Sequence, residues 1–175
     1  TICRLAEKGI IIELNAFHSK NCMGIHDVYE LENHPFRKPV MIMKANDRIG
    51  KPYIEVDASR IKGIVECNIP DEARAFKDTD EVTTTIGQNV ADFLLSNLRS
   101  GKIPASFLNL QSGVGSGANA VLGALGQCPE VPNFNIYTEV LQDAPVQLMR
   151  DGRVLSASTC SLTVTNDCLK GIYND

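Results

Sequence analysis

Short runs of apolar and β-branched residues alternate along the chain with stretches in which apolar residues recur every three or four positions. The first pattern is typical of buried strands and the second of amphipathic helices. Their alternation favours an α/β fold, with a mostly parallel sheet and flanking helices. In the first half of the chain, strands are expected at residues 9–14, 39–43 and 61–66.

The most regular helical pattern lies between residues 80 and 98, where the apolar positions are three or four residues apart. Gly101 is expected to end this helix. The residues predicted to form its buried face are Val82, Ile86, Val90, Phe93, Leu94 and Leu98.

The second half of the chain predicts two strand–turn–helix units, and we place a domain boundary near residue 100. In the second unit, Asp143 is expected to cap a helix, Pro145 to lie in its first turn and Gly152 to end it. The expected strands are residues 107–110, 133–138 and 153–158, and the first unit's helix is residues 118–126.

An uncharged, glycine-rich stretch, LNLQSGVGSGANAVLGALG, spans residues 108–126. A strand, a glycine turn and a helix in this order leave unpaired amides at the edge of a sheet. Without side chains at Gly113, Gly115 and Gly117, a phosphate or a developing oxyanion could approach these amides. The glycine spacing does not match the dinucleotide-binding fingerprint. On the pattern alone, close packing of helix and strand explains the glycines equally well.

Glu139 is expected at the same sheet edge as the glycine turn. The strand at 133–138 would end just before it, and successive parallel strands end on one edge. A carboxylate that faces an oxyanion site can act as a nucleophile. Its position alone fits an exposed loop glutamate better, because most glutamates are exposed and unreactive.

Composition excludes several classes of protein. The 175 residues are 43% hydrophobic, enough for a core, and the net charge of −4 arises from 17 basic and 21 acidic residues without a basic cluster. Neither a nucleic acid nor a membrane is therefore an expected partner. Polar residues interrupt the least charged stretch, residues 103–129, so no membrane helix is expected. The chain starts without Met or a leader, and we interpret it as a piece of a longer polypeptide.

The cysteines and histidines could form disulfides, redox pairs or a metal site. The six cysteines form no C-x-x-C pair, which favours free thiols in a reducing, cytoplasmic compartment. Cys160 and Cys168 match no dithiol motif and are expected to be small buried residues. His18, Cys22 and His26 are spaced four apart, as zinc ligands on a helix would be. Helix-breaking residues lie between them and no fourth ligand is evident, so no metal is expected.

Several segments together resemble a known family. LQSGVGSGANAVLGAL, YTEVLQD and VLSASTCSLT are similar to acetyl-CoA hydrolases and acetate- or succinate-dependent CoA-transferases, within the family I CoA-transferases. GIHDVYE, RIGKPYIEVD and IKGIVE resemble the same proteins in the same order, so the resemblance covers nearly the whole chain. Members of that family are longer and have two similar α/β halves. The resemblance therefore implies that residues 1–100 end a first half and residues 101–175 begin a second.

The resemblance also implies a chemistry and its residues. Glu139 would be the nucleophile, and the amide of Val114, with Gly115 as its neighbour, would form an oxyanion hole. The CoA-binding residues would be Gly113, Val114, Gly115, Ser116 and Gly117. The implied activity is CoA transfer or acetyl-CoA hydrolysis through a glutamyl-CoA thioester. CoA would be a substrate, and no further cofactor is expected. The expected partners are acyl-CoA and small carboxylic acids, and the protein could form a homo-oligomer. The alternative is a non-catalytic module that binds CoA or a nucleotide through the glycine turn alone.

Overall fold

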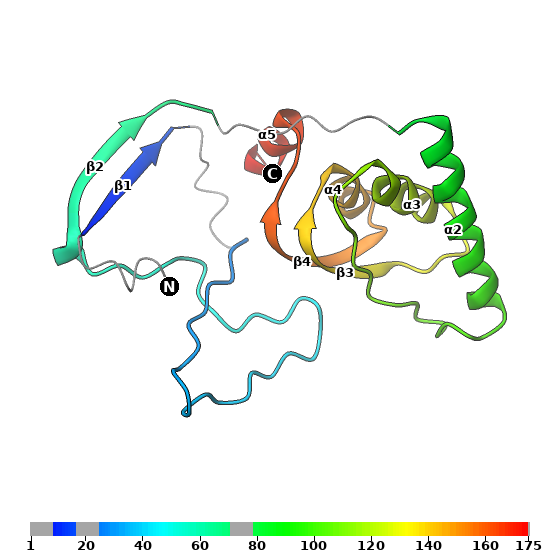
Figure 1. Ribbon diagram of the computed structural model, residues 1–175, viewed down its shortest axis with the longest axis horizontal. Helices are drawn as coiled ribbons and strands as arrows, with labels where there is room; N and C mark the ends of the chain where they lie inside the picture. The colour runs from blue at the N-terminus through cyan, green and yellow to red at the C-terminus, as the bar shows by residue number, and fades with distance from the viewer. Residues whose placement is uncertain (1–8, 17–24, 71–78, 175) are drawn as a thin grey trace. The chain divides into compact units, whose positions relative to one another are not determined.

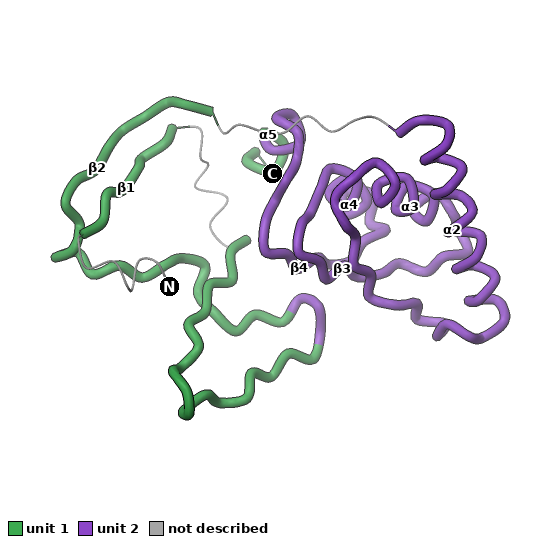
Figure 2. The backbone as a smooth tube through the Cα atoms, viewed as in Figure 1, with its two compact units in different colours: residues 1–43, 47–72, 170–175 green, residues 44–46, 73–169 purple. Residues whose placement is uncertain are grey.

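The computed structural model describes residues 9–16, 25–70 and 79–174. The chain divides into two compact units, which Figure 2 distinguishes by colour. Unit 1 comprises residues 1–43, 47–72 and 170–175, and unit 2 comprises residues 44–46 and 73–169. Each unit contains one parallel pair of strands, which confirms the α/β class. The boundary near residue 100 concerns the halves of a longer protein and stays a prediction.

Unit 1 is built around β1 (Ile10–Asn15) and β2 (Ile61–Cys67), a parallel pair in which Ile12 lies opposite Ile64. A short 3-10 turn, η2 (Ala58–Arg60), leads into β2. The strands predicted at 9–14 and 61–66 are therefore confirmed. The strand predicted at 39–43 is wrong, since these residues are irregular and mostly exposed. A strand needs a neighbouring strand for its hydrogen bonds, and an apolar run alone does not supply one.

Two segments that carry the family resemblance pair with each other in unit 1. Val28 and Lys51 form an antiparallel bridge with two backbone hydrogen bonds of 2.8 Å. The Asp27 carboxylate accepts hydrogen bonds from the amides of Ile49 and Gly50 at 3.2 and 2.7 Å. Hydrogen bonds to the Asp27 carboxylate and one antiparallel bridge thus connect the segments GIHDVYE and RIGKPYIEVD.

The longest helix, α2 (Glu81–Arg99), belongs to unit 2 and confirms the helix predicted at 80–98. Asp80 is its N-cap, and the Asp80 carboxylate accepts a hydrogen bond from the Thr83 amide at 2.8 Å. These contacts with Thr83 lower the pKa of Asp80. Gly101, with φ of +73°, lies just beyond the last turn and ends the helix as predicted.

The buried face of α2 differs from the predicted one. Gly87, Ala91 and Leu95 are buried, and α2 packs there against α3 (Ser116–Gln127), beside which it runs in Figure 1. A Cβ atom on Gly87 would lie 2.6 Å from the Ala120 carbonyl carbon, so the two backbones touch. Periodicity locates an apolar stripe, but small residues decide where two helices approach each other. Four residues of the predicted face are exposed instead, namely Val82, Ile86, Val90 and Phe93.

The sheet of unit 2 consists of β3 (Phe134–Leu141) and β4 (Val154–Leu162), joined by α4 (Asp143–Arg150), which packs against both. The strands predicted at 133–138 and 153–158 are confirmed. The strand predicted at 107–110 is wrong apart from one parallel bridge, Leu110 to Ile136, because Phe107 leaves the extended conformation with φ of +62°. The core of this unit includes Phe107, Leu122, Leu125, Phe134, Ile136, Val146, Leu148 and Val154.

The ends of α4 are partly as predicted. Pro145 lies in the first turn, and Gly152 follows the helix with φ of +71°. Asp143 is not the cap, because it is the first helical residue and Gln142 occupies the N-cap position. The Asp143 carboxylate instead accepts hydrogen bonds from the amide and hydroxyl of Thr165 at 3.1 and 2.5 Å. A last helix, α5 (Asn166–Asn174), follows and has no counterpart among the predicted elements.

Arg153 anchors the C-terminal end of α3 to the sheet. Its guanidinium donates hydrogen bonds to the carbonyl oxygens of Gly126, Cys128 and Val131 at 3.1, 2.9 and 2.7 Å. The last carbonyls of a helix have no partner inside it, so a cation there satisfies them and suits the helix dipole. With α3 fixed at this end, its N-terminal end has a defined place beside β3.

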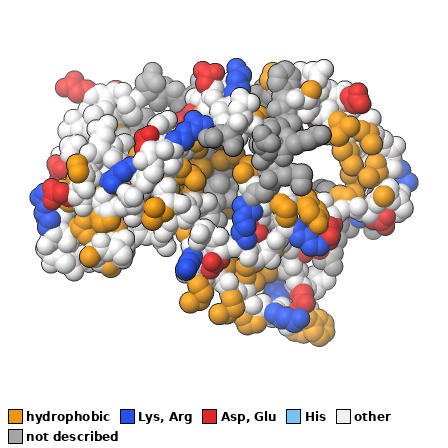
Figure 3. All heavy atoms as spheres, turned by 180° about the vertical axis from the view of Figure 1, so that it is seen from behind, with side chains coloured by type: hydrophobic (Ala, Val, Ile, Leu, Met, Phe, Trp, Pro, Cys, Tyr) orange, Lys and Arg blue, Asp and Glu red, His pale blue; other side chains and the backbone are white. Residues whose placement is uncertain are grey.

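Figure 3 shows that hydrophobic side chains also reach the surface in several places on the face it presents. No helix in the part of the chain that the structure describes is both long and apolar enough to cross a membrane.

Candidate functional site

The glycine turn lies alongside the C-terminal part of β3. Its N-terminal end is fixed by the bridge between Leu110 and Ile136, and α3 begins at its other end. The Thr138 hydroxyl donates a hydrogen bond to the Ser112 carbonyl oxygen at 2.7 Å. The Gln142 amide nitrogen donates one to the Gly113 carbonyl oxygen at 3.0 Å. The turn is thus bonded to residues on both sides of Glu139.

Glu139 lies inside β3 and not just beyond its end, because the strand continues to Leu141. It lies between the pairs Thr138–Thr159 and Val140–Ser161, level with Cys160 of β4. Glu139 is exposed, and its carboxylate makes no hydrogen bond or ion pair to any residue that the structure describes. An exposed carboxylate with no internal partner can meet a ligand.

The amides of the turn likewise have no partner in the described part of the chain. Those of Gly113, Val114 and Gly115 donate no hydrogen bond to any of the described residues. Gly115 is the N-cap of α3, no side chain caps the helix, and its first turn contains no acidic residue. The positive end of the α3 dipole and these amides can therefore receive an anion or a developing oxyanion.

Packing does not explain the glycines of the turn. A Cβ atom added at Gly113, Gly115 or Gly117 would meet no atom of the described chain within 4 Å. At Gly126, by contrast, it would overlap the Leu148 side chain. Gly115 has φ of +140°, which L-residues rarely adopt. The structure therefore favours the open approach to the backbone over the packing explanation that the sequence also allowed.

The sequence did not single out Thr138 and Gln142, which hold the turn. No local signal pointed to Gln142, because Asp143 was predicted to be the cap and Gln142 was placed before the helix.

Cys160, on β4, and Cys168, on α5, differ in exposure. Cys160 is exposed, so the expectation of a buried residue is wrong there, and Cys168 is half-buried. Burial raises the pKa of the Cys168 thiol to about 11, and the charge of Asp143 and a hydrogen bond to it add to this effect. A thiol with such a pKa is almost wholly protonated at neutral pH and is a poor nucleophile.

We expect the alkylation rate of Cys168 to rise about tenfold per pH unit from pH 8 to pH 10, because only the thiolate reacts. Peptide mass spectrometry after iodoacetamide treatment of the folded protein measures this rate. An unperturbed thiol would level off near pH 9.5. In the Asp143→Asn variant the levelling should move to lower pH, since one cause of the raised pKa is removed. Levelling below pH 9.5 in the wild type would contradict the assignment.

Two of the three residues in the zinc alternative, His18 and Cys22, lie outside the described residues. His26 is described, and its carbonyl oxygen accepts a hydrogen bond from Arg48 at 3.0 Å. Within residues 9–16, 25–70 and 79–174, no group of three or more His, Cys, Asp or Glu side chains could hold a metal ion.

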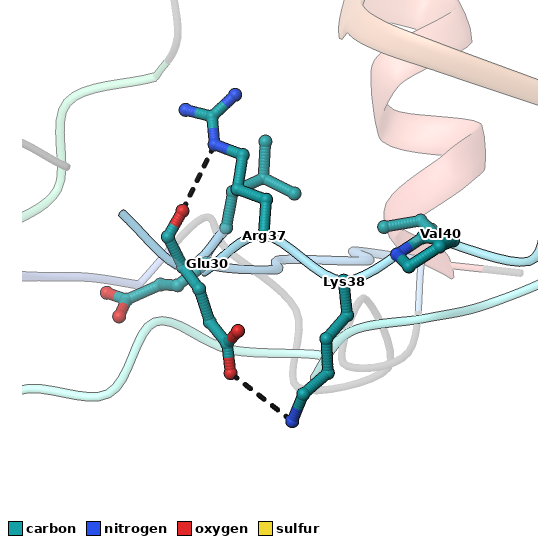
Figure 4. Close-up of a pocket in the computed structure, with 7 residues that line it drawn as sticks. Glu30, Arg37, Lys38 and Val40 are labelled. Atoms are coloured by element: carbon teal, nitrogen blue, oxygen red, sulfur yellow. Dashed lines mark hydrogen bonds and ion pairs between the residues drawn. The ribbon is translucent and has the colours of Figure 1, made fainter. Parts of the chain in front are cut away.

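A shallow pocket lies in unit 1 and contains none of the predicted site residues (Figure 4). Glu32 is one of its lining residues, with its carbonyl oxygen accepting a hydrogen bond from Arg37 at 3.0 Å and its carboxylate 3.6 Å from the Lys38 ammonium. The residues that line the pocket are exposed.

Comparison with known proteins points to one family. The chain is 39% identical over 171 residues to propanoyl-CoA:succinate CoA transferase of Escherichia coli, a match that covers 98% of this chain and 35% of that protein. It is 36% identical to acetyl-CoA hydrolase of Schizosaccharomyces pombe, over 99% of this chain and 33% of that protein. The chain is a member of the acetyl-CoA hydrolase and CoA-transferase family. No family model matches it.

Solved structures agree on the fold of this family member. RipA from Yersinia pestis matches 99% of the chain, and 32% of its own length, with a TM-score of 0.60 and 20% identity. The 4-hydroxybutyrate CoA-transferase from Porphyromonas gingivalis matches 96% of the chain, and 34% of its own length, with a TM-score of 0.54 and 16% identity. The CoA-transferase-like α/β fold is thereby shown. The chain spans about a third of the length of the curated relatives it matches.

Proposed function

We propose that the full-length protein containing this chain transfers CoA between acyl-CoA and small carboxylic acids, or hydrolyses acetyl-CoA, through a glutamyl-CoA thioester on Glu139. One observation carries the proposal. The exposed Glu139 side chain belongs to β3 and lies between the two residues that bind the glycine turn, and the Gly113, Val114 and Gly115 amides of that turn have no hydrogen-bond acceptor among the described residues.

The first half-reaction uses both parts of this site. The Glu139 carboxylate attacks the thioester carbonyl of acyl-CoA, and the amides of Val114 and Gly115 stabilise the resulting oxyanion. The C–S bond breaks, CoA leaves as a thiolate, and an acyl-glutamyl anhydride remains. The thiolate then attacks the glutamyl carbonyl, which releases the free carboxylic acid and leaves Glu139 as a CoA thioester.

The second half-reaction runs the same steps backwards with an acceptor carboxylate and regenerates Glu139. Only a carboxylate nucleophile can exchange its acyl group for CoA in this way, because the anhydride preserves the activation of the thioester. If water attacks the glutamyl-CoA thioester instead, CoA is released and the net reaction is hydrolysis. Residues 113–117 would hold CoA, and no further cofactor is needed.

The choice of substrates rests on the relatives. Their names mention propanoyl-CoA with succinate, succinyl-CoA with acetate, and acetyl-CoA alone. We therefore propose short acyl-CoA donors, small carboxylic acid acceptors and a role in acetate metabolism. We also propose a cytoplasmic location, since Cys67, Cys128, Cys160 and Cys168 are free thiols, as in a reducing compartment. A homo-oligomer stays a prediction.

The test is to incubate the purified full-length protein with acetyl-CoA and succinate. Chromatography then measures succinyl-CoA, and a thiol reagent measures free CoA. We expect succinyl-CoA to form, or free CoA to accumulate without an acceptor. CoA binding without either product would favour the non-catalytic module and overturn the proposal.

A further inference from the structure

The polar residues that are buried in the described part of the chain are Thr138, 6% exposed, and Gln142, 2% exposed. Their side chains bond to two consecutive residues of the glycine turn, Thr138 to Ser112 and Gln142 to Gly113. Burying a polar group is unfavourable unless it makes hydrogen bonds, so such residues usually hold something in place.

The position of Gln142 is not explained by the helix that it starts. It is the N-cap of α4, where a short side chain normally accepts a bond from a helix amide, yet the Gln142 side chain does not cap the helix. Its amide nitrogen binds the Gly113 carbonyl oxygen, and its oxygen accepts a bond from the Asn119 side chain at 3.4 Å. Asn119 belongs to α3, so Gln142 bonds to the turn and to the helix that follows it.

These bonds fix the direction of two amides. In a trans peptide the carbonyl of one residue and the N–H of the next point in opposite directions. Gln142 holds the Gly113 carbonyl, so the Val114 N–H points away from Gln142. Thr138 holds the Ser112 carbonyl, so the Gly113 N–H points away from Thr138. Neither of these amides has a partner among the described residues.

We propose that Gln142 and Thr138 are positioning residues that hold the peptide planes of the turn, and through them fix the direction of the Val114 amide, which stabilises the oxyanion in the proposed function. This inference rests on the proposed function. Neither side chain touches the reacting atoms; each acts through a peptide plane of the turn. If the carbonyl loses its side-chain partner, the peptide plane can rotate and the N–H no longer points at the oxyanion. The loss mainly raises the energy of the transition state.

The test compares kinetic constants of the full-length protein with acetyl-CoA as donor. We expect Gln142→Met, which keeps a similar volume, to lower kcat about 10- to 100-fold, a smaller loss than complete removal of an oxyanion donor. The KM for acetyl-CoA should change by less than about threefold, because ground-state binding is retained. Thr138→Val should act in the same direction, and Thr138→Ser, which keeps the hydroxyl, should restore activity close to the wild type.

Gln147→Met is the matched control. It makes the same substitution on α4 at an exposed position whose side chain bonds, among the described residues, to Asp151 alone, so its kinetics should equal the wild type. If Gln142→Met does not fold, as judged by circular dichroism, the Thr138→Val and Thr138→Ser pair decides alone.

Wild-type kcat in a folded Gln142→Met or Thr138→Val protein would overturn the inference while leaving the proposed function intact. The same holds if KM rises and kcat does not fall, or if Thr138→Ser is as impaired as Thr138→Val. A wild-type protein that neither transfers nor hydrolyses overturns the proposed function, and this inference with it.

Discussion

A Glu139→Gln substitution in the full-length protein should lower acyl-CoA turnover by roughly three orders of magnitude or more, as the loss of a covalent nucleophile does. The reason is chemical, since the amide cannot form the anhydride. The fold should not change, because the Glu139 side chain is exposed and bonds to no described residue. Turnover of acetyl-CoA with a saturating acceptor measures the effect.

The same variant decides where CoA is held. Wild-type protein incubated with acyl-CoA and no acceptor should carry a CoA adduct on the peptide containing YTEVLQD. Intact mass spectrometry detects this adduct, and borohydride reduction removes it. Glu139→Gln should lack it, whereas the control Glu130→Gln, which removes only an exposed ion pair with Arg99, should retain it. Full transferase activity in Glu139→Gln would end the proposal, and an adduct on Cys160 would move the nucleophile to the neighbouring strand.

The second large effect is expected at the glycine turn. Gly117→Ala should reduce kcat/KM for acyl-CoA by about tenfold or more, because its methyl group occupies space that a ligand needs beside the amides. Gly117 is the second residue of α3, where alanine is a better helix former than glycine. The thermal midpoint should therefore stay constant or rise while activity falls, a combination that simple misfolding cannot produce.

The controls for this prediction come from the same helix. Gly123→Ala also adds a methyl group that meets no other described part of the chain within 4 Å, but farther along α3, and should leave kcat/KM unchanged. Gly113→Ala should resemble Gly117→Ala. Gly115→Val is less informative, because the φ of +140° strains any side chain whether or not a ligand binds. Unchanged kcat/KM in both Gly113→Ala and Gly117→Ala would mean that no ligand approaches the turn closely.

The sequence predicted the elements whose signals are local. The helix at 80–98 had a regular period of apolar residues and a glycine stop, and the structure contains both the helix and the stop. The strands at 9–14, 61–66 and 133–138 pair with parallel neighbours. The failures have non-local causes. Residues 39–43 look like a strand but pair with no strand in the described ranges, and the face of α2 that packs was decided by Gly87 meeting α3.

The candidate site was accessible from sequence only in part. The glycine turn and Glu139 stood out because their residue types and their family resemblance pointed to the same chemistry. Asp143 was assigned to the wrong task, since its partner Thr165 lies 22 residues away and no local pattern reveals that contact. The roles of Thr138 and Gln142 were hidden for the same reason, because their hydrogen bonds reach back 26 and 29 residues to the turn.

The close contact between Gly87 and Ala120 has a mechanical consequence. Between most packed helices, side chains can change rotamer and absorb a small shift, but here backbone meets backbone with nothing deformable between them. Ala120 lies little more than one turn from the N-terminus of α3. A push of that end of α3 toward α2 would therefore be resisted by backbone and not absorbed by side chains.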